Sequence, residues 1–228
     1  TLNVTANAQS SQLLDNQGGQ LEAAQLKLQA ANIDNSAGGR MVQSNSSTLQ
    51  IDTGKLDNSA GGQLVHAGDL RVNAASIDNR EGVIASEGGS LDVSGKALDN
   101  RQGQIASQGA LGLNVANVDN RSGQIGSYTG DVRVKAQGVD NRAGLISSER
   151  DLDIEATGVN NNGGQIASQS GGLRVNARTL DNSKGLISSA LDLGIDATSV
   201  NNNAGQIASL AAALLMSAES LRSREGLG

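Results

Sequence analysis

The sequence predicts an all-β protein, a parallel β-helix in which short coils stack along one axis. Three observations predict this fold. An aliphatic residue followed by Asp-Asn or Asn-Asn recurs ten times in 228 residues, at intervals of 19–23 residues. A Gly and a second aliphatic residue follow at fixed distances, and a stretch of alternating apolar and polar residues completes each repeat. A period near 21 residues suits one coil of a solenoid and is too short for a pair of helices.

The recurring motif also sets the number of coils. Its aliphatic residue marks ten anchor positions, and an eleventh repeat opens at Leu221. We therefore expect ten to eleven coils of about 20–21 residues each. The ten anchors are Leu14, Ile33, Leu56, Ile77, Leu98, Val118, Val139, Val159, Leu180 and Val200.

The stretch before each anchor alternates apolar and polar residues, as Leu111, Leu113 and Val115 do. A period of two indicates a β-strand with one buried face. We expect three short strands per coil, which bury their apolar faces only when coils stack. The segment Leu210–Leu221 is rich in Ala and Leu but keeps the same offsets, so we interpret it as another coil rather than a helix.

The coils differ in length at one turn. From the aliphatic residue after the Gly to the next alternating strand, the step is seven residues in one coil and six in the next. A surface loop can absorb the extra residue, whereas in a strand it would turn the apolar face outward. The repeat is therefore a pair of coils, 41 residues long. In two early turns we take Gly38 and Gly61 as the turn glycines and Gly39 and Gly62 as inserted residues.

An Asn occupies the same position after every anchor. Because an amide both donates and accepts, stacked Asn side chains could form a ladder from coil to coil, or each could serve only its own turn. Asn also tolerates the left-handed conformation that we expect at a sharp corner. The ten residues are Asn16, Asn35, Asn58, Asn79, Asn100, Asn120, Asn141, Asn161, Asn182 and Asn202.

A Gly stands three residues after the Asn in seven successive coils. We expect these glycines to be structural turn residues, since Gly is the residue that tight turns favour. They are Gly82, Gly103, Gly123, Gly144, Gly164, Gly185 and Gly205.

Charged residues flank the Asn column. Asp precedes the Asn and Arg follows it in four consecutive coils, from Asp78 and Arg80 to Asp140 and Arg142. Where the Asp becomes Asn160, the Arg also becomes Asn162, so charge is lost in pairs. One hypothesis is that the Arg column offsets repulsion within the Asp column; the alternative is an ordinary solvated face worth about 0–1 kcal/mol per pair.

Composition excludes several classes of protein. The chain has no Cys, Pro, Trp or Phe, one His and one Tyr, and a net charge of −6. We therefore expect no catalytic residues, no cofactor, no metal site and no nucleic-acid partner. No stretch approaches the roughly 20 apolar residues of a membrane span. We interpret His66 as a solvated strand residue, and Tyr128 as either a surface contact or an incidental loop aromatic.

The repeated segment LDNRQGQIASQGALGLNVANVDNRSGQI resembles the repeats of filamentous haemagglutinin and of the large exoproteins of contact-dependent growth inhibition. The resemblance covers the chain from about Leu14 to Leu221. It implies a right-handed parallel β-helix that a Gram-negative bacterium exports by two-partner secretion. An outer-membrane transporter would be the export partner, and the protein would lie on the cell surface or be secreted.

Two functions remain open after this resemblance. The chain, 1–228, could be a single β-helix shaft fragment, uncapped at both ends, that projects a distal receptor-binding or toxin-delivering region as a monomeric rod. Alternatively, the shaft itself could bind a cell-surface receptor, a glycan or a biofilm matrix polymer. The segment Val42–Gln50 and the turn around Tyr128 come nearest to a binding surface, but the regularity of the repeat favours the shaft.

Overall fold

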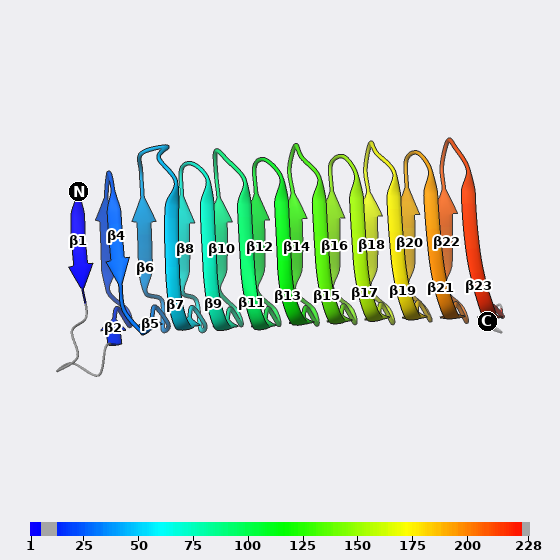
Figure 1. The fold of residues 1–228 in the computed structure, drawn as a ribbon, viewed down its shortest axis with the longest axis horizontal. Helices are drawn as coiled ribbons and strands as arrows, with labels where there is room; N and C mark the ends of the chain where they lie inside the picture. Colours follow the sequence, from blue (N-terminus) through cyan, green and yellow to red (C-terminus); the bar gives the residue numbers. More distant parts are fainter. Residues whose placement is uncertain (6–12, 225–228) are drawn as a thin grey trace.

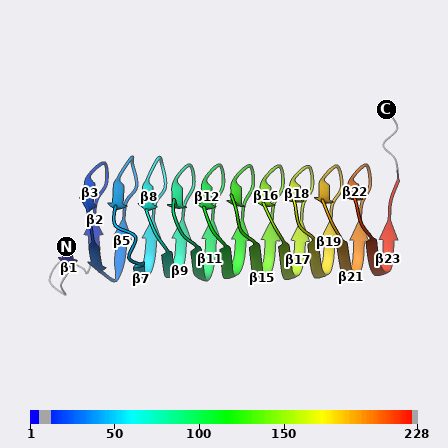
Figure 2. The same ribbon diagram turned by 90° about the horizontal axis from the view of Figure 1, so that it is seen from above.

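A computed structural model describes residues 1–5 and 13–224, and all regular structure in this part of the chain is β-strand. The coils stack along one axis into a rod with β1 at one end and β23 at the other (Figure 1). The view from above shows the same regular succession of coils (Figure 2). The expected all-β parallel solenoid is therefore confirmed.

Two parallel sheets form the walls of the rod, and in each sheet the strands follow one another in sequence order. The 11-stranded sheet contains β2 (Leu13–Asp15), β5 (Asn32–Asp34), β7 (Leu49–Asp57), β9 (Leu70–Asp78), β11 (Leu91–Asp99), β13 (Leu111–Asp119), β15 (Val132–Asp140), β17 (Leu152–Asn160), β19 (Leu173–Asp181), β21 (Leu193–Asn201) and β23 (Leu214–Arg222).

The 10-stranded sheet consists of four-residue strands. They are β3 (Gln20–Ala23), β6 (Arg40–Gln43), β8 (Gln63–His66), β10 (Val83–Ser86), β12 (Gln104–Ser107), β14 (Gln124–Ser127), β16 (Leu145–Ser148), β18 (Gln165–Ser168), β20 (Leu186–Ser189) and β22 (Gln206–Ser209). A separate two-stranded sheet joins β1 (Leu2–Thr5) to β4 (Leu26–Gln29).

Each coil from β7 onward has two strands rather than the three that the sequence suggested. The nine-residue strand β13 buries Leu111, Leu113 and Val115 at steps of two and then Val118 after a step of three. The pairing of β11 with β13 skips one residue pair at this place, between Val115 and Asn117. The expected third strand is therefore the end of the second one, beyond a bend that shifts the alternation by one residue.

The core lies between the two sheets and is aliphatic. Ile105, Leu111 and Val118 are at most 3% exposed, and the equivalent residues of the other inner coils are similarly buried. Full burial of one such side chain contributes about 1.5–3 kcal/mol. Because every inner coil supplies the same set, each is stabilised by its two neighbours.

The connections lie on two edges of the rod (Figure 1). On one edge, loops of four and three residues alternate between a short strand and the next long strand, as 87–90 and 108–110 do. This confirms that the extra residue of every second coil lies in a loop. On the other edge, the Asn-containing turns lead from each long strand to the next short one. The segment Leu210–Leu221 continues this pattern and forms most of β23.

Candidate functional site

The Asn column lies inside the turn edge and is buried. The eight residues from Asn35 to Asn182 have no exposed surface, and Asn16 is 7% exposed. In each of the nine steps along the column, Nδ2 of one Asn donates to Oδ1 of the Asn in the next coil at 2.7 Å. A continuous chain of amide hydrogen bonds therefore runs along the rod.

The same amides also bond to backbone carbonyls of their turns. Nδ2 of Asn100 donates to the carbonyl of Gln124 in the next coil at 3.1 Å and lies 3.3 Å from that of Gly103 in its own turn. The ladder and the local turn contact, which the sequence offered as alternatives, thus coexist. A buried amide with all its partners present stabilises the stack, whereas an unpaired one would cost about 1–3 kcal/mol.

The left-handed residue of the turn is not the Asn. Positive φ angles occur two residues later, at Gln102 (58°), Ser122 (56°) and their equivalents, and at Gly163 (62°). The expectation that Asn supplies the left-handed conformation is therefore wrong. The turn closes through a hydrogen bond from Gly103 N to Asn100 O at 3.0 Å, which places the left-handed position third in the turn.

The turn glycines are needed because the backbone of the preceding coil comes close. A Cβ on Gly103 would overlap the carbonyl oxygen of Asn79, and each of the other six glycines meets the equivalent Asn carbonyl. None of the seven has a positive φ. Gly39 and Gly62 make this close approach in the early turns, so our assignment of them as inserted residues is wrong: the inserted residues are Gly38 and Gly61.

The residue before the Asn holds the turn through its side-chain oxygen. Oδ1 of Asp99 accepts a hydrogen bond from Arg101 N at 3.2 Å, which is an Asx turn. Asn160 accepts the equivalent bond from Asn162 N at 3.1 Å. The turn therefore needs an oxygen at this position rather than a charge, and this explains why Asn can replace Asp there, as it does at Asn160 and Asn201.

The Asp and Arg columns form a continuous set of ion pairs. Arg101 Nη2 lies 2.6 Å from Asp99 of its own coil, and Nε lies 3.6 Å from Asp119 of the next. The side chains are 39% exposed for Arg101 and 29% for Asp99 and Asp119. Partial burial raises the pKa of the Asp119 carboxyl, but hydrogen bonds from Arg121 and the charges of both arginines outweigh it, and the pKa lies below its usual value.

A second buried polar column escaped the sequence analysis. It consists of the last residues of the short strands, and six of its seven serines are at most 6% exposed: Ser86, Ser107, Ser127, Ser148, Ser168 and Ser189. The hydroxyls of Ser107 and Ser127 both donate to the carbonyl of Gly109 at 2.7 Å. Ser148 and Ser168 share Arg150 O in the same way. Two coils therefore converge on one loop carbonyl, which gives the 41-residue repeat a structural basis.

His66 occupies this column and has no exposed surface, so its interpretation as a solvated residue is wrong. It lies at the register position of Ser86, next to Gln43 in the preceding coil. Nδ1 is 3.3 Å from the carbonyl of Gln43, and Nε2 has no hydrogen-bond partner among the described residues. The recurring Ser two residues after the buried Ile was the signal that could have located this column.

Tyr128 lies on the loop edge, opposite the Asn turns. Its side chain is 62% exposed, and its backbone N–H donates to Ser107 O at 2.9 Å. The segment Val42–Gln50 holds the loop 44–48, which is closed from inside by a hydrogen bond from Gln43 Nε2 to Ser47 O at 2.7 Å. The two expected contact regions thus lie in loops, while the Asn and Gly columns lie in the turns.

In the described ranges 1–5 and 13–224, no group of three or more His, Asp or Glu side chains lies around a common point where it could hold a metal ion. The same residues include no helix of the length and hydropathy needed to cross a membrane.

The repeated coils also match a known family of repeats. The haemagglutinin repeat family matches residues 1–47, 42–96, 87–138, 127–178 and 167–222, which together span nearly the whole chain. No curated protein and no solved structure gives a significant match. The described coils carry the stacked β-solenoid that the resemblance implied. The chain belongs to the haemagglutinin repeat family.

Proposed function

We propose that this chain is a shaft segment of a large secreted or surface-displayed bacterial adhesin or exoprotein. Its coils would hold a distal receptor-binding or toxin-delivering region away from the cell. The observation that carries the proposal is the uninterrupted register from β7 to β23, in which each long strand pairs with both neighbours at equivalent residues. Each coil adds one strand spacing, about 4.8 Å, so the number of coils sets the reach.

In this proposal the chain is a single β-helix unit that leaves a Gram-negative cell through the outer-membrane transporter of a two-partner secretion system. Its working location is outside the outer membrane. The sequence has no Cys. Such a chain can cross the oxidising periplasm unfolded without forming disulfides that would block its export.

The number of coils can be changed without disturbing the turns. Deletion of residues 101–141 joins Asn100 to Arg142 and removes one 41-residue pair of coils with one loop of each length. In the protein that contains this segment, we expect the deletion to leave target binding unchanged. Insertion of four further copies of this 41-residue pair of coils should lengthen the fibre by about 40 Å, as measured by electron cryomicroscopy. Loss of binding on deletion, with folding intact, would contradict the shaft function.

The exposure of Tyr128 favours one alternative, in which the side of the rod binds a receptor, a glycan or a matrix polymer. Exposed aromatic side chains often anchor such contacts. The test is binding of the purified chain to sibling bacteria, to epithelial cells and to extracted biofilm polysaccharide. Saturable binding that Tyr128→Ala abolishes would replace the shaft by a side-wall adhesin. If the folded rod binds none of these targets, the shaft function stands and the alternative fails.

A further inference from the structure

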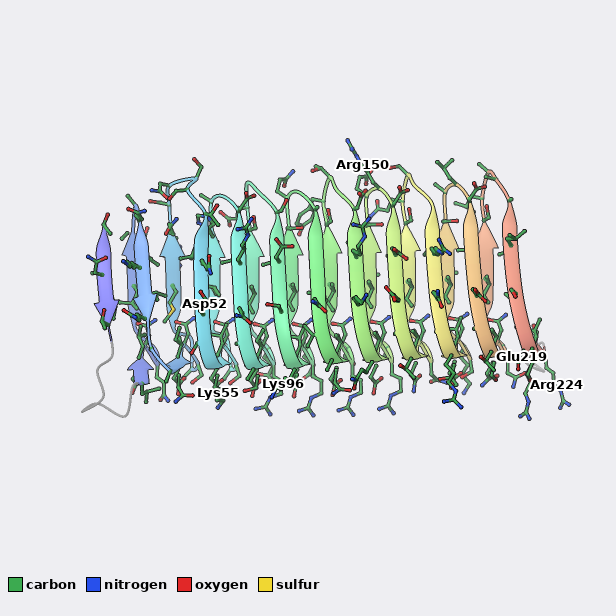
Figure 3. The ribbon with its side chains drawn as sticks, in the orientation of Figure 1. Asp52, Lys55, Lys96, Arg150, Glu219 and Arg224 are labelled. Atoms are coloured by element: carbon green, nitrogen blue, oxygen red, sulfur yellow. The ribbon has the colours of Figure 1, made fainter. Side chains whose placement is uncertain are left out.

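Charge is divided unequally between the two sheets of the rod. The eight short strands from β8 to β22 contain no Asp, Glu, Lys or Arg, whereas each of the eight long strands from β9 to β23 contains at least one. The charged side chains labelled in Figure 3 lie on long strands, on the loop edge or after β23. One wall of the rod is therefore uncharged along eight coils.

The outward side chains of these short strands form two parallel columns, which we call the neutral strip. In each short strand the second and fourth residues point into the core, as Ile125 and Ser127 do in β14. The first and third residues therefore point outward. The third residues are mostly small, and the first residues are Gln or an aliphatic residue. The neutral strip consists of Gln63, Val65, Val83, Ala85, Gln104, Ala106, Gln124, Gly126, Leu145, Ser147, Gln165, Ala167, Leu186, Ser188, Gln206 and Ala208.

The facing wall has a different surface. Outward side chains of several long strands carry opposite charges in neighbouring coils, and they pair across the strands: Arg71 lies 3.8 Å from Asp92, and Lys135 lies 3.4 Å from Glu155. Water solvates such a wall well. The neutral strip offers water only amides, hydroxyls and half-buried aliphatic groups, and charged residues are the type most depleted from the centres of protein interfaces.

We propose that the neutral strip is an interaction surface for a second copy of this chain, so that two rods pair side by side. Both rods carry outward residues at the same strand spacing, and small side chains let two such sheets approach closely with their columns interdigitated. A two-fold axis between the rods would apply the same strip to itself. The proposal goes beyond the shaft function, which needs one rod only, and it revises the expectation of a strictly monomeric rod.

A second copy suits the strip better than a polymer does. The strip has no aromatic side chain on which a sugar ring could stack and no charge that could hold an ionic polymer. Approach through the one wall without charge also keeps the charged side chains of the two copies, each of net charge −6, farther apart and so lessens their repulsion.

The area of the strip predicts the strength of the pairing. Eight strands about 4.8 Å apart, each about 13 Å long, present roughly 500 Å² per copy. Two facing copies then bury roughly 1,000 Å², which is the lower limit for a specific interface. Pairing should therefore be weak, reversible and dependent on concentration.

The test is sedimentation equilibrium of the 228-residue chain over a range of concentrations up to about 1 mM, where even a millimolar dissociation constant is detected. Gln124 and Gln165 are exposed on the strip, and the double variant Gln124→Glu/Gln165→Glu changes charge at nearly constant shape. We expect it to weaken dimerisation by about tenfold or more, because unpaired charges would be buried. The control, Asn114→Asp/Gln137→Glu, adds the same charge at exposed positions of β13 and β15 and should leave dimerisation unchanged.

Small-angle X-ray scattering of the associated species separates side-by-side pairing from end-to-end stacking. Paired rods have a larger cross-section at unchanged length, whereas stacked rods are longer at unchanged cross-section. A chain that stays monomeric at about 1 mM would overturn the proposal, as would longer rods or a dimer that only the control variant weakens. If the monomeric chain instead binds an uncharged polysaccharide and Gln124→Glu/Gln165→Glu abolishes this, the occupant is a polymer and the proposal also fails. The coil deletion described above gives its result independently, so failure of one proposal does not imply failure of the other.

Discussion

Two columns of side chains run next to each other along the turn edge, and water reaches them to very different degrees. The Asn column is buried from Asn16 to Asn182 and keeps the same residue in all ten coils, while the position directly after the Asn holds Arg, Ser, Asn or Gln. A buried amide must find every partner inside the protein, because an unsatisfied one is costly. A half-exposed ion pair can exchange its partner for water at little cost. The comparison teaches that repeats are strict where stacking replaces water and variable where water remains.

The largest effect should come from filling the space between coils. Gly123→Ala places a Cβ on the carbonyl oxygen of Asn100, and backbone atoms cannot move aside as a flexible side chain can. We expect a loss of about 3 kcal/mol or more in the free energy of unfolding, measured by urea denaturation. Gly194→Ala is the control, since the nearest atom to its Cβ is Arg174 Cγ at 4.0 Å. It should change stability by at most about 0.5 kcal/mol, and equal losses for both variants would contradict the account.

The second-largest loss of stability should come from changes in the buried Asn column. Asn120→Ala removes the ladder hydrogen bond that Nδ2 of Asn100 donates and the one that Oδ1 of Asn141 accepts. We expect a loss of about 2–4 kcal/mol by the same measurement. Asn114→Ala, at an exposed position of β13, should cost no more than about 0.5 kcal/mol. The ladder would have no special role if Asn120→Ala were as mild as this control.

Changes in the half-exposed Arg column should lower the stability only slightly. Arg101→Gln removes ion pairs to Asp99 and Asp119 but leaves the Asx turn intact. We expect a loss of at most about 1 kcal/mol, and less in about 0.5 M salt because these pairs are half exposed. Arg150 projects from the loop edge and is a control outside the column (Figure 3). Equal losses for Arg101→Gln and Arg150→Gln would remove the hypothesis that the Arg column offsets repulsion between the aspartates.

Low pH should weaken the interactions that the carboxylates of the Asp column make. Because the pKa of Asp119 is lowered in the folded chain, its contribution is complete above the unfolded value of about 3.9 and is lost as pH falls through the folded value. Asp57 behaves alike: burial opposes the shift, but hydrogen bonds from Ser59 and Lys55 lower its pKa. Asp119→Asn keeps the turn oxygen, as Asn160 does. We expect it to reduce the fall in stability between about pH 4 and pH 2; an unchanged fall would show that Asp119 contributes nothing.

Much of this structure could be predicted because burial imposes a period on the sequence. The anchors and the stacked Asn residues follow from residues that recur where the chain faces its own interior, and β23 follows from the same offsets. The alternating loop lengths could be predicted for the opposite reason, since only a surface loop tolerates an extra residue.

Other features left no distinct signal. Ser86 and its equivalents resemble surface residues, because a hydroxyl can be satisfied either by water or by a loop carbonyl. His66 is read as exposed for the same reason, although it shares their buried column. The bend near Val115 merges two expected strands, and a one-residue change of phase there resembles an ordinary turn. The left-handed position is occupied by residues as different as Glu81 and Ala143, so composition could not locate it.

A buried amide ladder specifies how the coils stack, and hydrogen exchange of the Asn side chains shows whether water reaches that ladder. In ¹⁵N-labelled chain, the Nδ2 protons of Asn100, Asn120 and Asn141 should exchange at least about a thousandfold more slowly than those of exposed Asn114. Their protection should match that of the backbone amides in β13. Exchange of the column at the rate of Asn114 would contradict the account, because it would mean that water reaches the amides in the folded rod.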